Sequence, residues 1–241
     1  MRSALFAAEN MEKESQQPGM RLQNSKMLKI ELNGECMART GSMVAYQGQV
    51  QFQALGSGGM GKWLKQKLTG EGVPLMKVSG RGDVFLGDRA ADVHLIDIEQ
   101  GDAISINGTN VLAFDSSVQY DIKMVQGMGM MSSSGLFNCV FTGQGRIAIT
   151  TKGTPVVLNV DQPTYVDPQA AICWSASLQT GYHRAEQMGL GTLLGRTTGE
   201  RFTMSFAGQG FVVVQPSEEP PPGAAAGQQQ QGGVLGNLLG G

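Results

Sequence analysis

The sequence predicts an all-β protein, a β-sandwich of three repeated units with one or two short helices. A Gly-x-Gly followed by an apolar, β-branched run starts at residues 80, 143 and 208, at intervals of 63 and 65 residues. A recurrent interval of this kind indicates a duplicated structural unit. The 35 glycines and the low charged fraction, 16%, are typical of many short strands and tight turns.

The glycines of this repeat are predicted to form structural turns that lead into strands, because glycine permits backbone angles and close approaches that a Cβ forbids. They are Gly80, Gly82, Gly143, Gly145, Gly208 and Gly210. A phosphate-binding glycine loop would have to open a helix. None of the three copies is followed by a helical pattern, so the repeat is interpreted as architectural.

The chain divides into a polar lead over residues 1–19, a β domain over 20–215 and a Pro/Gly/Gln-rich tail over 216–241. Such a tail cannot bury enough surface to offset the entropy of ordering it.

The β domain begins with a strand that alternates polar and apolar residues over 27–32 and ends in Asn33-Gly34, a strong hairpin signal. Two further strands, 43–46 and 50–55, are predicted on either side of a turn at 47–49.

A short amphipathic helix is predicted over residues 60–68, where Trp63, Leu64 and Leu68 share one face. Strands then follow the first Gly-x-Gly at 93–98, 104–106 and 111–114. The second copy is followed in the same order by strands at 156–160, 165–167 and 171–174. A second short helix or loop is predicted over 186–199.

Composition limits the classes of partner and compartment. The net charge of −2 provides no field to attract nucleic acid, so nucleic-acid binding is not expected. Cys36, Cys139 and Cys173 lack a C-x-x-C spacing and are predicted to be reduced and mostly buried. No apolar run approaches the ~18 residues of a membrane span, and no secretory signal is present. A cytoplasmic location is expected, with peripheral membrane contact as an alternative.

Motifs that could carry chemistry are weak. Residues 56–62 have the spacing of a phosphate-binding loop, but Trp63 stands where a magnesium-binding Ser or Thr is needed. Two histidines, His94 and His183, are few for a metal enzyme. The carboxylates Asp97 and Glu99, like Asp83 and Asp88, also fit a solvated strand face. No catalytic, cofactor or metal residue is assigned.

Two segments are candidates for binding. Lys62, Trp63, Lys65 and Lys67 could contact an anionic membrane surface, or they could belong to a helix that caps one end of the sandwich. The tip of the tail carries Val234, Leu235, Leu238 and Leu239, which could dock on a neighbouring subunit or partner, or stay solvated.

Several motifs in a fixed order resemble the AIM24 family over about residues 20–215. They are Gly41-Ser42-Met43-Val44, the 62–68 segment with Gly70-Glu71-Gly72, the three Gly-x-Gly copies, Val166-Asp167 and the run 206–215. The resemblance implies a fold similar to that of the tryptophan RNA-binding attenuation protein, with three short β units fused around a pseudo-threefold axis. It implies no established activity, although the eukaryotic members are mitochondrial and implicated in inner-membrane organisation.

The leading functional hypothesis is a non-enzymatic β-sandwich scaffold that assembles with itself, as a homo-oligomer, or with another protein, in a position that could be near a membrane. The alternative is single-stranded RNA binding by analogy with the attenuation protein, although a fold does not imply a function. A cupin-like enzyme is the third hypothesis, disfavoured by the small number of histidines.

Overall fold

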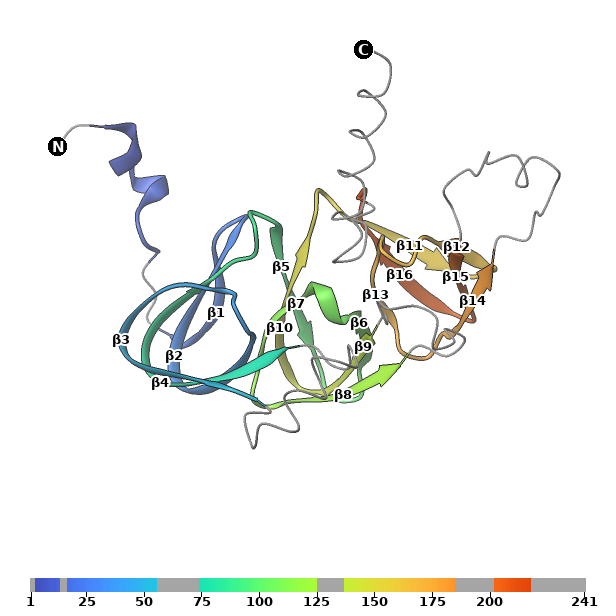
Figure 1. Ribbon diagram of the computed structural model, residues 1–241, viewed down its shortest axis with the longest axis horizontal. Coiled ribbons are helices and arrows are strands. Elements are labelled where there is room, and N and C mark those ends of the chain that lie inside the picture. The colour runs from blue at the N-terminus through green and yellow to red at the C-terminus, as the bar shows by residue number, and fades with distance from the viewer. Residues whose placement is uncertain (1–2, 14–16, 56–73, 125–136, 185–201, 218–241) are drawn as a thin grey trace, which may run out of the picture.

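A computed structural model describes residues 3–13, 17–55, 74–124, 137–184 and 202–217 (Figure 1). Within these ranges the regular secondary structure consists of β-strands and three short 3-10 helices, at Ala4–Phe6, Ala8–Asn10 and Gly108–Asn110. The all-β prediction is therefore confirmed. Both predicted helices, over 60–68 and 186–199, lie outside the described residues.

Sixteen strands are described in chain order. They are β1 (Gly19–Asn24), β2 (Met27–Arg39), β3 (Met43–Ala54), β4 (Leu75–Leu86), β5 (Asp92–Ile98), β6 (Ala103–Asn107), β7 (Val111–Asp115), β8 (Val118–Met124), β9 (Phe137–Gly143), β10 (Gly145–Thr151), β11 (Val156–Val160), β12 (Thr164–Val166), β13 (Ala171–Ser175), β14 (Gln179–Arg184), β15 (Phe202–Ala207) and β16 (Gly210–Val214).

The strands form three sheets. The first has the order β3-β4-β2-β7-β10-β5, with β1 paired to β2, the second has the order β11-β16-β13-β6-β9-β8, and the third has the order β12-β15-β14. The pairings given for the described strands are antiparallel.

The sheets divide into three units that lie side by side in Figure 1: unit 1 (β1–β4), unit 2 (β5–β10) and unit 3 (β11–β16). Unit 2 contributes the triplet β5-β10-β7 to the first sheet and the triplet β6-β9-β8 to the second. Unit 3 repeats this pattern, with β11-β16-β13 in the second sheet and β12-β15-β14 in the third. The interval of about 64 residues in the sequence is thus a repeat of six strands.

Unit 1 builds the same arrangement from three long strands, which are strongly curved in Figure 1. Strands β2, β3 and β4 are 13, 12 and 12 residues long. The turns predicted at Asn33-Gly34 and at 47–49 are wrong, because β2 and β3 continue through them. Gly80 and Gly82 likewise lie inside β4 and do not form a turn.

Positive φ angles explain why these glycines bend the strands. Gly34 pairs with Gly80, and Gly82 pairs with both Leu32 and Gly48, so the glycines cross the sheet as one line. Gly34, Gly48, Gly80 and Gly82 have φ angles of 127°, 90°, 126° and 152°. Glycine inside a strand commonly marks such a bend or a close backbone approach. Each long strand therefore changes direction at this line without ending.

In units 2 and 3 the same glycines lie where the chain leaves one sheet for another. Gly143 ends β9 in the second sheet, and Gly145 begins β10 in the first sheet. Gly208 follows β15 of the third sheet, and Gly210 begins β16 of the second sheet. A Cβ at Gly210 would lie 2.6 Å from Ser175 Oγ, so the crossing leaves no room for a side chain.

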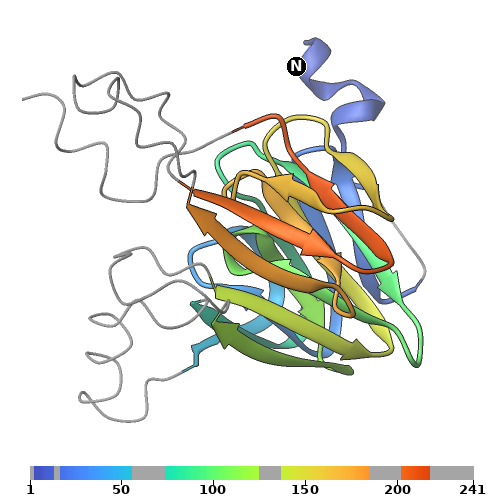
Figure 2. The same cartoon turned by 90° about the vertical axis from the view of Figure 1, so that its right-hand side faces the viewer.

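Adjacent units are joined by strand pairing. Strand β2 of unit 1 pairs with β7 of unit 2, and β6 of unit 2 pairs with β13 of unit 3. Three apolar cores follow the units, and the first two also contain residues of the next unit, such as Leu112 and Ile172. Figure 2 looks along this row from the unit 3 end, so that unit 3 overlies the other units. Strand pairing in the described residues makes an open row and does not close the units into a ring.

Candidate functional site

Neither of the binding segments expected from the sequence can be located. Lys62, Trp63, Lys65 and Lys67 lie outside the described residues, as do Val234, Leu235, Leu238 and Leu239. The membrane contact of the first segment and the docking of the second therefore stay predictions.

The ionisable residues singled out from the sequence lie in separate surroundings. His94 Nε2 is 2.9 Å from Thr151 Oγ1. Asp97 binds Arg146 through two charge-assisted hydrogen bonds, of 2.6 and 2.9 Å, which lower the pKa of its carboxyl. Asp88 forms an ion pair of 2.7 Å with Arg39. His94 and Asp97 thus join β5 to β10, whereas Asp88 ties the loop after β4 to Arg39 on β2.

The three cysteines are free and buried, as the sequence predicted. Burial raises the pKa of Cys36, Cys139 and Cys173 to about 12. The thiolate is the reactive form of cysteine, so these thiols are poor nucleophiles at neutral pH.

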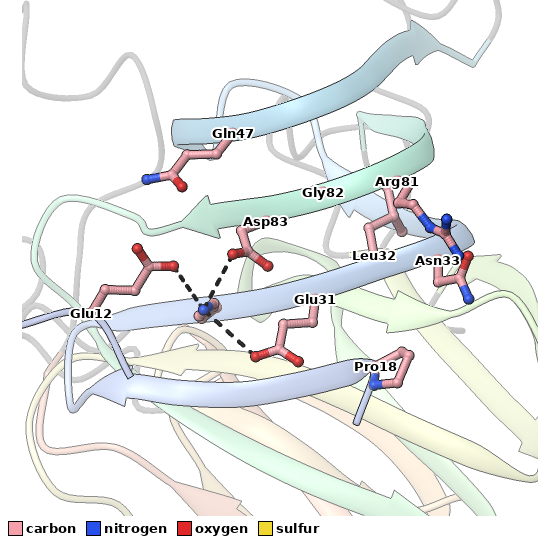
Figure 3. A pocket seen from close by; sticks show the side chains of 10 residues that line it. Glu12, Pro18, Glu31, Leu32, Asn33, Gln47, Arg81, Gly82 and Asp83 are labelled. Atoms are coloured by element: carbon pink, nitrogen blue, oxygen red, sulfur yellow. Dashed lines mark hydrogen bonds and ion pairs between the residues drawn. The ribbon is translucent and has the colours of Figure 1, made fainter. Parts of the chain in front are cut away.

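A charged cluster around Lys29 borders a hollow of about 560 Å³ (Figure 3). The Lys29 side chain is 3% exposed, and its Nζ lies 2.7 Å from Glu12, 3.4 Å from Asp83 and 3.6 Å from Glu31. It also donates a hydrogen bond of 2.8 Å to the carbonyl oxygen of Lys13. A buried ammonium is costly unless it is paired in this way.

Electrostatics keep this cluster in its charged form. Burial alone would lower the pKa of Lys29, but the carboxylates of Glu12 and Asp83 outweigh it and raise this pKa. The hydrogen bond from Lys29 in turn lowers the pKa of Glu12. Because the ammonium already occupies the position between the carboxylates, the cluster acts as a clamp that fixes residues 12 and 13 to β2.

A second feature, the apolar edge segment at residues 43–46, lies at the start of β3. Met43, Val44 and Tyr46 are 42%, 56% and 49% exposed. Within the described residues β3 pairs only with β4, so it forms an edge of the first sheet. Isolated exposed apolar residues are ordinary, but a contiguous apolar row on a strand edge marks a place for another chain.

The edge segment corresponds to segments that are buried in the other two units. Tyr46, Phe114 and Trp174 pair with Val84, Ile147 and Val212, each of which lies two residues after the second glycine of its repeat. The strand register also shifts at the same place in all three: between Met43 and Ala45, beside Ala148 and Ile149, and between Ala171 and Cys173. Residues 43–46 are therefore equivalent to residues 111–114 and 171–174.

The equivalent residues differ sharply in exposure. Phe114 is 1% exposed and Trp174 is 4% exposed, against 49% for Tyr46. Strand β2 of unit 1 covers β7, and β6 of unit 2 covers β13. Phe114 packs against Phe141 and Trp174 packs against Phe206, each within its own unit. Within the described residues no strand pairs with the outer edge of β3.

A second exposed edge is found in unit 3. Strand β12 pairs with β15 and forms one edge of the third sheet within the described part of the chain. Tyr165, at its centre, is 59% exposed. Figure 1 places β3 and β12 at opposite ends of the row of units.

Sequence reasoning missed both the Lys29 cluster and the edge segment. Lys29 lies between two apolar residues of an alternating strand, and such a position ordinarily faces solvent. The edge segment could have been found by aligning the three copies on their glycines, which places Tyr46 with Phe114 and Trp174. The exposure of the edge segment, however, depends on which strands and side chains lie beside β3 in the folded protein.

No helix among the described residues is long and apolar enough to cross a membrane. No curated protein matches the chain. The crystal structure of protein SPYM3_0169 from Streptococcus pyogenes is similar, with a TM-score of 0.64 and 20% sequence identity over 83% of this chain and 92% of that chain. At this identity the likeness concerns the fold alone. The family model described as Mitochondrial biogenesis AIM24 matches residues 20–217, and the chain therefore belongs to the AIM24 family.

Proposed function

We propose that the protein is a non-enzymatic scaffold that binds another polypeptide chain along the edge of β3. The observation that carries this proposal is the edge segment at residues 43–46, which is exposed, whereas its two counterparts are buried and pair with a strand of a neighbouring unit. Adding a strand to such an edge supplies main-chain hydrogen bonds and covers the apolar side chains. The segment thus combines an unpaired strand edge with exposed apolar side chains, which are the two features that strand addition uses.

The ionisable groups of the described residues support a structural role. Lys29 is held by carboxylates and Arg146 by Asp97. Cys36 and the other two cysteines are buried, with raised pKa values. The charged groups are paired with one another and the thiols are buried, whereas the edge segment at residues 43–46 is exposed.

The test is the mass of the full chain in solution, measured by light scattering after size-exclusion chromatography. We expect an assembly that Tyr46→Lys weakens at least about tenfold, a change equivalent to ~1.4 kcal/mol. A lysine on an edge strand disfavours the addition of another strand. The matched control is Val157→Lys, which places the same charge on β11, where Val157 is 63% exposed.

Equal weakening by both substitutions would show that the β3 edge has no special role. A chain that stays monomeric and binds no other polypeptide through β3 would contradict the proposed function altogether.

A further inference from the structure

We call the strand pairing between two adjacent units a joint. The two joints have the same strand arrangement. At the first joint, β2 meets β7 with Met37 opposite Phe114. At the second joint, β6 meets β13 with Ser105 opposite Trp174. Each joint consists of three antiparallel residue pairs. In each, one strand of a unit covers the apolar segment of the unit that follows it.

The covering strand can be identified in every unit by its register. Cys36 and Ile104 pair with Val78 and Phe141, which lie two residues before the first glycine of their repeats. In unit 3 the residue that pairs with the equivalent Phe206 is Thr164, in β12. Strand β12 is therefore the covering strand of unit 3, and within the described residues β15 is its only pairing partner.

At each end of the row of units, one strand that is equivalent to a joint strand therefore has no partner strand from another unit within the described residues. In unit 1 this strand is β3, whose residues 43–46 are equivalent to the segments that pair with a preceding unit. In unit 3 it is β12, which is equivalent to the strands that pair with a following unit (Figure 1). Both strands are sheet edges within the described residues, and both carry an exposed tyrosine, Tyr46 and Tyr165. Because β3 and β12 are equivalent to the two strands of an internal joint, β12 of one copy can pair with β3 of another copy.

The geometry points to a second copy of this chain as the occupant of the β3 edge, bound head to tail through its β12. The register of the internal joints places Val166 opposite Ala45, Tyr165 opposite Tyr46 and Thr164 opposite Gln47. The third sheet of one copy then continues into the first sheet of the next. This inference rests on the proposed function and names its partner.

Such a contact is heterologous, because two different surfaces meet. It therefore generates either a closed ring or an open chain of copies, and not an isolated symmetric dimer. The apolar edge segment would be covered in all copies of a ring and in all but one copy of an open chain.

Site-specific crosslinking tests the register. Chains with Tyr46→Cys are mixed with chains with Tyr165→Cys and treated with a short bis-maleimide. Side chains directly opposite each other on antiparallel strands have Cβ atoms about 4.5–5.5 Å apart. The native cysteines are buried, so the introduced cysteines provide the exposed thiols among the described residues. A difference in tag length identifies which chains are joined.

The expected result is a crosslink between the two kinds of chain in the mixture, with little product from either kind alone. Thr164→Cys in place of Tyr165→Cys is the matched control, because successive side chains of a strand point to opposite faces. We expect the control mixture to give at least several-fold less product. Circular dichroism of each variant shows that it is folded.

Three outcomes overturn the inference. Tyr46→Cys chains that crosslink with one another would show a symmetric β3 contact, which contradicts head-to-tail pairing but leaves the proposed function intact. Equal crosslinking by the control would contradict the register. A wild-type chain that stays monomeric at high concentration would contradict self-assembly, while binding of a different polypeptide at β3 would still support the scaffold.

Discussion

Gly34 and Gly80 face each other across β2 and β4 with almost the same backbone angle, φ of 127° and 126°. They differ in their surroundings. A Cβ at Gly34 would have no atom within 4 Å, whereas a Cβ at Gly80 would lie 2.1 Å from the carbonyl oxygen of Gln49. The pair therefore separates the cost of backbone strain from the cost of a steric clash.

We predict that Gly34→Ala lowers the free energy of unfolding by about 1–3 kcal/mol, the usual cost of a strained backbone angle. Gly80→Ala should cost clearly more, because β3 must also move away from β4. Urea denaturation of both variants measures the difference. Equal losses would mean that the close approach of β3 and β4 does not restrict residue 80.

Acid should release the clamp formed by Lys29 and Glu12. The pKa of Glu12 is held below its ordinary value of 4.5 by the hydrogen bond from Lys29. A carboxyl with a lowered folded-state pKa stabilises the fold fully above its ordinary pKa, and this contribution is lost as the pH falls through the folded-state pKa. We expect wild type to be more stable than Glu12→Gln above about pH 5 and the difference to shrink below pH 4.

Thermal unfolding of both chains between pH 3 and pH 7 tests this expectation. Glu9→Gln, which removes a carboxylate from the same lead and leaves the Lys29 cluster intact, is the control. A gap between wild type and Glu12→Gln that is constant with pH would contradict the assigned role of the ion pair.

Lys29 also shows what the sequence can and cannot predict about a residue. The alternation of residues 27–32 correctly predicted a strand, but in such an alternating pattern a lysine at position 29 ordinarily faces solvent. The residues that bury it come from outside this strand, from the lead at Glu12 and from Asp83 on β4. Such long-range partners leave no periodic signal in the sequence, so the cluster could not be predicted.

At the scale of elements, the sequence predicted the repeat and misjudged unit 1. Asn33-Gly34 is a strong hairpin signal because a hairpin needs positive φ. A positive φ can also bend a strand that continues, and the choice depends on the neighbouring strand. In this protein β4 pairs with β2 on both sides of Gly34, from Leu28 to Arg39, and keeps it a single strand. Local turn chemistry cannot reveal that pairing.

Both joints between units contain a side-chain hydrogen bond that a joint made by β12 would lack, and this difference predicts how firmly copies associate. Arg39 Nη1 donates to the carbonyl oxygen of Thr109 at the first joint, at 2.6 Å. Asn107 Nδ2 donates to that of Ala171 at the second joint, at 3.3 Å. The equivalent residue in unit 3 is Asp167, which as a carboxylate has no donor. A joint made by β12 therefore lacks this bond.

We predict that Asp167→Asn strengthens self-association about threefold to tenfold, in line with a net ~0.5–1.5 kcal/mol for one hydrogen bond. The asparagine oxygen can still accept from the backbone N–H of Gln169, as Asp167 Oδ1 does at 2.7 Å. Sedimentation at several protein concentrations measures the association constant. Asp161→Asn, with the same loss of charge in the preceding loop, is the control. Weaker association of Asp167→Asn than of this control would contradict the equivalence of the joints.

At the scale of the whole molecule, the three units are continuous through shared sheets and shared cores. The first core includes Leu112 and Ala148 of unit 2, and the second includes Leu75 of unit 1 and Ile172 of unit 3. The sequence interval predicted the number of units, and the family resemblance implied their fold. Their order as an open row is a property of strand pairing, and it leaves β3 and β12 as unpaired edges at its two ends within the described residues. The pairing of β3 with β12 can therefore be tested only between separate copies of the chain.

Head-to-tail assembly predicts that two variants, each unable to assemble alone, restore one joint when mixed. Tyr46→Lys blocks the β3 edge and leaves β12 intact, whereas Tyr165→Lys blocks β12 and leaves β3 intact. Each variant alone should be monomeric by light scattering, because every possible joint then contains a lysine. Their equimolar mixture should give a dimer of twice the chain mass and nothing larger, because the β3 and β12 edges that remain unpaired in the dimer both carry a lysine. A mixture that stays monomeric would exclude the joint, and a mixture that forms larger species would show that copies associate through another surface.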